Sequence, residues 1–489
     1  MISFSSLFST FSLSAIITSL QSTLKASLED FIHYDFNRHL TLHSGLLALC
    51  YLVIIFGIAY RVDYIIEFNP MHEIWSDPAR HWIQGTDVLR FDPMSQTDPI
   101  VYQLYIGALA RLTLKIPELV AFYTIILACF TPWIWYRFLR ELQPSKEAAI
   151  LGWALLSLIP SWISIYGYYM QETLFLPLLG LAFYSTWRCK RKQTLNSFIT
   201  MVTIWVIAGL TRGVAIPLAA VACTWLWVLQ QQKFKKAIWS PLLFGLIMGP
   251  LTYRSYNIMH IFAPHGVGHM NMIYAKSGAR SIEIQYEREG VRWGYIFQSP
   301  AAEAKPFAPF SDWQSQREGR VHAYVNIDKG MEDWETAIAK QSLSLEKYLW
   351  ITRDNLILLF FSDSWPDSNR ARTIGEINYQ TRWIWFLLAI IGLVATAFTW
   401  PQQRRHLLFP CMILIWFIVQ GLLPISVNEG RYRMPFNGMV IAWLILIWGT
   451  RKDHPAPVSI CDDAIDCDIN KDIDSDGYTN IDNTAELQR

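Results

Sequence analysis

Two adjacent stretches decide the class of fold: the apolar segment HSGLLALCYLVIIFGIAY (residues 43–60) and the charged segment EIWSDPARHW (residues 73–82). About 20 apolar residues cross the hydrocarbon core of a bilayer, so the first stretch predicts a transmembrane helix. The second places two carboxylates, an arginine and a histidine beside the membrane, where charged side chains are costly and usually functional. We therefore predict a membrane protein whose first loop carries its chemistry.

Composition extends this class to the whole chain. Of the 489 residues, 52% are hydrophobic and 17% are charged, whereas soluble domains carry roughly 25% charged residues. The formal net charge of +1 argues against nucleic acid as a partner, because nucleic-acid-binding domains need a basic surface. The seven cysteines lie mostly in apolar runs and indicate no disulfide framework.

Further apolar segments predict an all-α polytopic bundle of about ten transmembrane helices. Two other apolar segments, 98–114 and 344–362, are interrupted by polar residues and are typical of helices that lie along the membrane surface. The candidate spans are 43–60, 116–136, 148–166, 171–187, 195–211, 213–230, 237–254, 382–400, 407–425 and 434–450.

Basic residues orient this bundle by the positive-inside rule. With a cytoplasmic N-terminus, the short inner loops hold basic clusters such as residues 188–192, whereas the short outer connections hold only Arg212, Arg431 and Arg433. Both termini are then cytoplasmic, and the first loop (61–115) faces outward. We expect an amphipathic lead-in (1–42), a transmembrane module (43–254), a mixed extracytoplasmic region of short helices and loops (255–381), C-terminal transmembrane helices (382–450) and an acidic, disordered tail (451–489).

Asp77 in the first loop is the candidate catalytic residue. A carboxylate within hydrogen-bond reach of an acceptor hydroxyl or amine can take its proton as that group attacks. The alternative is structural, because Asp77 precedes Pro78 and would suit the N-cap of a helix. Glu73, Arg80 and His81 are candidate neighbours in the same loop.

Three later motifs supply candidate partners for this loop. Glu172 begins a span at the outer boundary, where it either meets solvent or faces the same cavity as Asp77. Arg212, in the turn Gly209-Leu-Thr-Arg-Gly213, suits a bidentate phosphate contact or snorkels to lipid headgroups. Arg431 and Arg433, in Glu429-Gly-Arg-Tyr-Arg-Met-Pro435, are the strongest phosphate candidates, because arginine is otherwise disfavoured on an outer turn.

The sequence indicates no metal site. His260, His265 and His269 do not have zinc-site spacing. The tail residues Asp472, Asp474, Asp476 and Gly477 match the front of a calcium loop, but its twelfth position is Asn483 rather than glutamate.

The order of these motifs resembles the GT-C superfamily of membrane glycosyltransferases, particularly bacterial relatives of protein O-mannosyltransferases and aminoarabinose transferases. The resemblance covers about residues 43–450 and implies a polyprenyl-phosphate sugar donor, no other cofactor, and an active site on the outer face of the bacterial inner membrane. By position it implies that Asp77 is the base, that Arg431 and Arg433 contact phosphate, and that Arg212 and Glu172 line the cavity. Ser76-Asp77-Pro78 has one acid where the mannosyltransferase branch often has an Asp-Glu pair, so the acceptor and any metal requirement stay open.

Chemistry agrees with this resemblance, because a sugar used outside the inner membrane must arrive activated on a lipid, and arginine stabilises a departing phosphate. Tyr102 is a candidate for stacking on the sugar, or for interfacial anchoring. Two alternatives stay open. An O-antigen polymerase or ligase predicts essential residues within 255–381, and a transporter of lipid-linked intermediates predicts charges near span midplanes.

Overall fold

The computed structural model describes residues 42–72, 74, 76–87, 95–96, 98–142, 144–229, 239–259, 261–266, 281–288, 290–298, 320–326, 344–361, 372–399, 404–422 and 430–448. The expectations for the lead-in up to residue 41 and for the acidic tail with its calcium-like sequence lie outside these residues. So do those for Glu73, His260 and His269.

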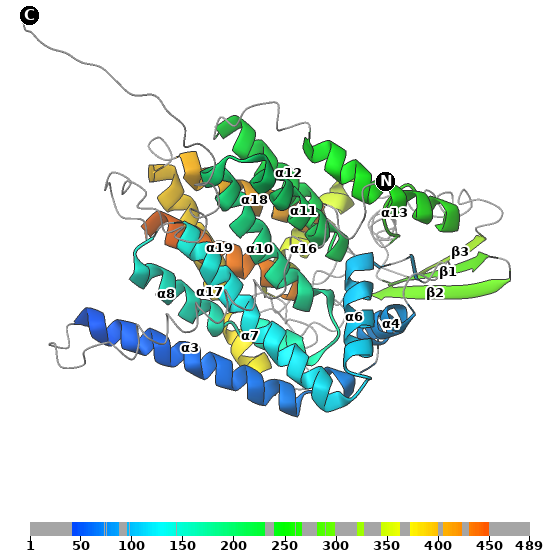
Figure 1. Ribbon diagram of the computed structural model, residues 1–489. Helices are drawn as coiled ribbons and strands as arrows, with labels where there is room; N and C mark the ends of the chain where they lie inside the picture. The colour runs from blue at the N-terminus through cyan, green and yellow to red at the C-terminus, as the bar shows by residue number, and fades with distance from the viewer. Residues whose placement is uncertain are drawn as a thin grey trace, which may run out of the picture. The chain divides into compact units, whose positions relative to one another are not determined.

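The described residues are predominantly helical, which confirms the predicted helical class (Figure 1). The helices up to residue 192 are α3 (Leu42–Glu67), η1 (Pro70–His72), α4 (Ser76–Thr86), α6 (Ile100–Leu112), α7 (Pro117–Glu141), α8 (Lys146–Ser157), α9 (Ser161–Ser164), η2 (Ile165–Gly167) and α10 (Gln171–Lys192). The later helices are α11 (Leu195–Thr211), α12 (Ala215–Thr224), η3 (Trp225–Leu229), α13 (Trp239–Met259), α16 (Leu345–Phe361), α17 (Arg372–Thr399), η8 (Arg404–Leu407), α18 (Leu408–Phe417), η9 (Ile418–Leu422), η10 (Gly430–Arg433) and α19 (Met434–Trp448).

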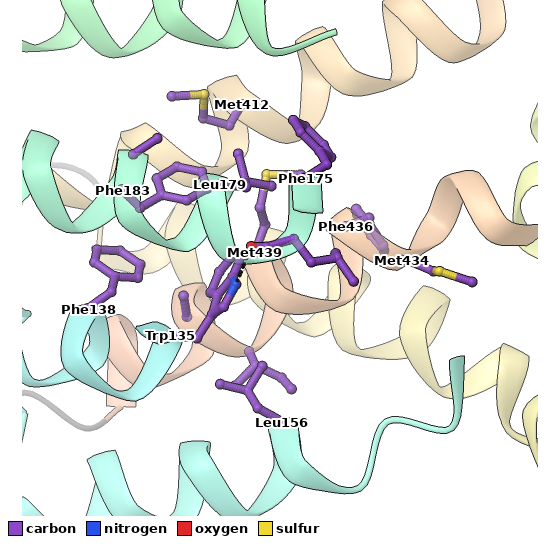
Figure 2. Packing of buried hydrophobic residues seen from close by; sticks show 14 of the residues in the cluster. Trp135, Phe138, Leu156, Phe175, Leu179, Phe183, Met412, Met434, Phe436 and Met439 are labelled. Carbon is purple, nitrogen blue, oxygen red and sulfur yellow. Dashed lines mark hydrogen bonds between the residues drawn. The ribbon is translucent and has the colours of Figure 1, made fainter. Parts of the chain in front are cut away.

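Trp135 of α7 is at the centre of the hydrophobic core, between α10 and α19 (Figure 2). The indole is fully buried, and its Nε1 donates a 3.0 Å hydrogen bond to the Leu176 carbonyl of α10. A Cβ added at Gly180 or at Gly438 would lie 2.8 Å from this ring. The two glycines therefore let α10 and α19 approach one large aromatic side chain from different sides.

A buried arginine joins α3 to a break between α8 and α9. Pro160 has no backbone N–H, so the Leu156 carbonyl has no helical donor four residues later. The guanidinium of Arg61, 1% exposed, donates to the Ser157 carbonyl at 2.6 Å and to the Leu156 carbonyl at 3.5 Å. A Cβ at Gly57 would lie 2.7 Å from the Ser157 oxygen, so glycine permits this close helix crossing.

A three-stranded sheet was not predicted in the region 255–381. Strands β1 (Ser281–Arg288) and β2 (Val291–Gln298) form an antiparallel hairpin, and β3 (Arg320–Asn326) pairs parallel to β1, giving the order β2-β1-β3 (Figure 1). Arg288 pairs with Val291, which leaves a two-residue loop in which Gly290 has φ of +76°. Glycine is suited to that left-handed conformation.

The prediction of about ten transmembrane helices is not supported. Three helical segments among the described residues are long and apolar enough to cross a membrane, Ser44–His72, Pro117–Glu141 and Thr373–Phe398, and the pair Lys146–Ser157 and Ser161–Gly167, bent by 65°, is a fourth if counted as one span. Predicted span 434–450 forms a helix of 15 residues, or ~22 Å at 1.5 Å per residue, which is shorter than a hydrocarbon core of ~30 Å. Most side chains of this helix are buried within the protein. The prediction used apolar character alone, which is the same for a helix packed inside the protein and for a helix that contacts lipid.

Candidate functional site

The first turn of α4 holds a carboxylate and a guanidinium in direct contact. Helix α4 begins at Ser76, so Asp77 lies inside its first turn, rather than at the N-cap position considered from the sequence. A carboxylate there interacts favourably with the helix dipole. Arg80, one turn later, donates from Nη1 to Asp77 Oδ1 at 2.6 Å. Their side chains are 21% and 25% exposed for Arg80 and Asp77, respectively.

A second carboxylate, Asp98, shares this arginine. Arg80 Nε donates to Asp98 Oδ2 at 2.6 Å, and Gln171 Nε2, at the start of α10, donates to Asp98 Oδ1 at 3.2 Å. The Asp98 side chain is only 1% exposed. Asp98 was not predicted, although Asp98-Pro99 precedes α6 much as Asp77-Pro78 begins α4.

Close packing of α4 on α6 brings these groups together. A Cβ at Gly85 would lie 3.2 Å from the Gln103 carbonyl and closer still to Ile106, so a glycine is required where the helices meet. Gln103 Nε2 in turn donates to the backbone carbonyls of Asp98 and Ser95, both at 2.8 Å. These two hydrogen bonds hold the loop that contains Asp98 against α6.

Electrostatics favour a charged Asp98. Burial alone would raise the pKa of Asp98, but the charge of Arg80, the attraction of His81 and the hydrogen bond from Arg80 outweigh burial and hold that pKa below its usual range. Burial lowers the pKa of His81 despite the attraction of Asp98, whose Oδ2 is 3.8 Å from His81 Nδ1. Burial therefore favours the neutral imidazole of His81, and Arg80 favours the ionised carboxylate of Asp98.

His81 packs against an aromatic side chain of α6. The edge of its ring meets Tyr102 with 5.0 Å between centroids, and the Tyr102 hydroxyl is 3.5 Å from Thr173 Oγ1 of α10. Burial raises the pKa of Tyr102 well above its usual range. Tyr102 is 1% exposed, so it packs inside the protein, and neither stacking on a sugar nor interfacial anchoring describes this position.

The residue after Gln171 in α10 forms a second ion pair. Glu172, 2% exposed, pairs with Arg212, which follows α11. The Arg212 guanidinium also lies over the ring of Tyr432, 4.7 Å from its centroid. Glu172 is thus neither solvated nor isolated, and Arg212 joins α10 and α11 to the turn η10.

The segment 261–266 packs on the loop that carries Asp98. Gly266 N donates to the Gln96 carbonyl at 3.0 Å, and Gln96 Nε2 donates to the Pro264 carbonyl at 3.1 Å. His265 is 7% exposed, and burial lowers its pKa to about 4, with Asp98 opposing. A Cβ at Gly213 would lie 3.5 Å from His265 Nε2, so His265 sits beside the Arg212 turn.

The predicted phosphate residues of η10 fall into two cases. Arg433 is 2% exposed, and its Nη1 donates to the carbonyls of Leu359 at 2.9 Å and Phe360 at 2.6 Å, at the end of α16. The structure thus gives Arg433 a role on the protein backbone, which corrects its assignment as a phosphate contact. The Arg431 backbone belongs to η10, and its side chain lies outside the described residues.

These contacts form two sets that meet at consecutive residues of α10, and together we call them the chain of polar groups. Hydrogen bonds link Asp77, Arg80, Asp98 and Gln171. Glu172, the next residue, pairs with Arg212, whose guanidinium lies over Tyr432. The chain combines a carboxylate that is 25% exposed, Asp77, with a guanidinium that is 11% exposed, Arg212. Among the described residues, no three His, Cys, Asp or Glu side chains are grouped as a metal site would require. No protein-family model and no curated protein matches this sequence.

Proposed function

We propose that this chain is an integral membrane glycosyltransferase of the GT-C type, which moves a sugar from a polyprenyl-phosphate donor to an acceptor outside the bacterial inner membrane. The observation that carries the proposal is the chain of polar groups from Asp77 to Tyr432. It gathers residues from α4, the turn before α6, the start of α10, the residue after α11, and η10. Motifs distant in sequence, whose order suggested the family, are thus close in space.

In the proposed reaction Asp77 accepts the proton of the acceptor hydroxyl or amine. The acceptor atom forms a bond to the anomeric carbon as the bond from that carbon to the phosphate oxygen breaks, and the electron pair leaves with polyprenyl phosphate. Attack opposite the leaving group inverts the anomeric configuration. Asp77 suits the role because its side chain is 25% exposed, whereas that of Asp98 is 1% exposed.

Arg212 and Arg431 are the proposed phosphate contacts. Arg212 already neutralises Glu172, so a donor with one negative charge needs a further cation. Arg431 is adjacent to Tyr432, whose ring covers Arg212, and we assign the larger share to Arg431. Arg433 is left out because its guanidinium binds α16.

Release of prenyl phosphate from short-chain polyprenyl-phosphate hexoses and pentoses tests the proposal, with purified chain and bacterial envelope extract as acceptor. We expect Asp77→Asn to lower the release rate by about 10²- to 10⁴-fold, the range for loss of a general base. Asp87→Asn, which changes an exposed carboxylate just after α4, should keep full activity. No release by the unaltered chain with any donor would contradict the proposal, and translocation of the intact donor without release would indicate a transporter.

The phosphate assignment has its own test. Arg431→Ala should raise the KM for the donor and leave the KM for the acceptor nearly unchanged, since only the donor carries the phosphate. Equal effects on both constants would remove Arg431 from the phosphate site.

A further inference from the structure

We infer that Asp98 is a positioning residue, which fixes the Arg80 guanidinium so that Arg80 can orient the carboxylate of Asp77. The inference rests on the proposed function, because orientation of Asp77 matters only if Asp77 transfers a proton. It adds a second acidic residue, contributed by the turn before α6, to the single acid of the first-loop motif.

Geometry separates the roles of the two carboxylates. Asp98 is held by Arg80 Nε at 2.6 Å and by Gln171 Nε2 at 3.2 Å, and its backbone carbonyl is held by Gln103. Its side chain is 1% exposed, so an acceptor cannot reach it. Asp98 is therefore the fixed end of the arrangement, and the more exposed Asp77 is the end that can meet a substrate.

Arg80 can transmit this constraint because a guanidinium is a rigid plane with several donors at fixed angles. Its Nε faces Asp98 and its Nη1 faces Asp77. Two bonds from one plane define where the second carboxylate lies. Without the Asp98 charge, the long arginine side chain loses its fixed partner, and Asp77 loses a defined position.

The surroundings of Asp98 preserve its charge. Arg80 and His81 face it from α4, Gln171 and Glu172 lie at the start of α10, and His265 approaches from segment 261–266. Arg80 is the cation in hydrogen-bond contact with Asp98, and the pKa of Asp98 is lowered despite burial. An ionised Asp98 is thus present throughout the neutral pH range, so the arrangement needs no proton uptake to form.

The main experiment is a double-mutant cycle on prenyl phosphate release. Asp98→Asn should lower kcat by about 10- to 100-fold, as expected for a misplaced catalytic group, with the donor KM unchanged. In an Asp77→Asn background, the same substitution should have little further effect. If the double variant loses kcat by the product of the two single-variant factors, the inference is overturned, because Asp98 would then act independently of Asp77.

Two further measurements separate positioning from loss of fold. Arg80→Lys keeps a positive charge but not the two-sided fork, so we expect a similar loss of kcat with less loss of thermal stability than in Asp98→Asn. Full kcat in Arg80→Lys would contradict the inference. If Asp77→Asn itself is fully active, the proposed function fails instead.

Discussion

Arg212 and Arg433 look alike in the sequence and differ in the structure. Each lies in a short turn between apolar helices, and each suggested a phosphate contact. Arg212 meets the carboxylate of Glu172 and the ring of Tyr432. Arg433 instead meets the last carbonyls of α16. The final carbonyls of a helix have no partner within that helix, so a buried guanidinium can serve the backbone as well as a ligand.

The comparison predicts that replacing the two arginines lowers the stability of the fold by different amounts. The larger loss is expected at Arg212. Arg212→Ala leaves the buried Glu172 charge without its cation and should destabilise the chain by about 4 kcal/mol. Denaturant titration in detergent micelles measures the change. The paired variant Arg212→Ala with Glu172→Ala should recover part of this loss. A paired variant that is no more stable than Arg212→Ala would show that Glu172 carries no buried charge.

The second-largest difference is expected in how stability depends on pH near the Arg212 turn and near the Arg433 turn. His265 beside Gly213 has a folded-state pKa of about 4, against ~6.5 when unfolded. The unfolded chain then binds the extra proton more readily, so stability is complete above pH 6.5 and falls as the pH drops towards 4, by up to about 3 kcal/mol. His265→Gln should flatten this part of the stability profile. The Arg433→Ala variant should keep it, because backbone carbonyls do not titrate, and an identical profile in His265→Gln would refute the assignment.

Arg433→Ala should cost less than Arg212→Ala, about 2 kcal/mol, because it leaves two carbonyls rather than a charge without a partner. Thermal unfolding in detergent gives the comparison. Arg433→Lys retains a donor and should fall between the unaltered chain and Arg433→Ala. A selective rise in donor KM in a stably folded Arg433→Ala variant would restore the phosphate role that the structure argues against.

The smallest effect is expected at Tyr432, which lies between Arg431 and Arg433. Tyr432→Leu removes the ring under the Arg212 guanidinium and should destabilise by about 1 kcal/mol. Tyr432→Phe keeps the ring and should lose less in the same denaturant titration. Equal losses in the two variants would show that the ring face contributes nothing to holding Arg212.

Parts of this structure were predictable because local sequence determines them. Apolar runs indicated the helical class. That Glu172 and Arg212 lie together was expected from the family resemblance and not from local sequence. The strands had a local signal too, since Ile282, Ile284 and Tyr286 alternate with polar residues before a loop containing Gly290, but the surrounding polarity concealed it.

Other parts depend on contacts between distant segments. Asp98 gains its importance only because Gln171, 73 residues away, and Arg80 converge on it. Arg433 could not be assigned without knowing that α16 ends beside it. The number of spans was overestimated because a helix that packs within protein is as apolar as one that contacts lipid, as α19 illustrates.

The Arg61 contact constrains how the polypeptide is assembled as it is synthesised. If α3 inserts into a bilayer as it leaves the ribosome, Arg61 enters before its carbonyl partner at Ser157, 96 residues later, has been made. Of the carbonyl acceptors that the fold gives this guanidinium, only that of Gly57, in its own helix, is present until then, and the carbonyls of Leu156 and Ser157 are still missing. The bent α8–α9 segment therefore completes the contacts that hold α3 in place.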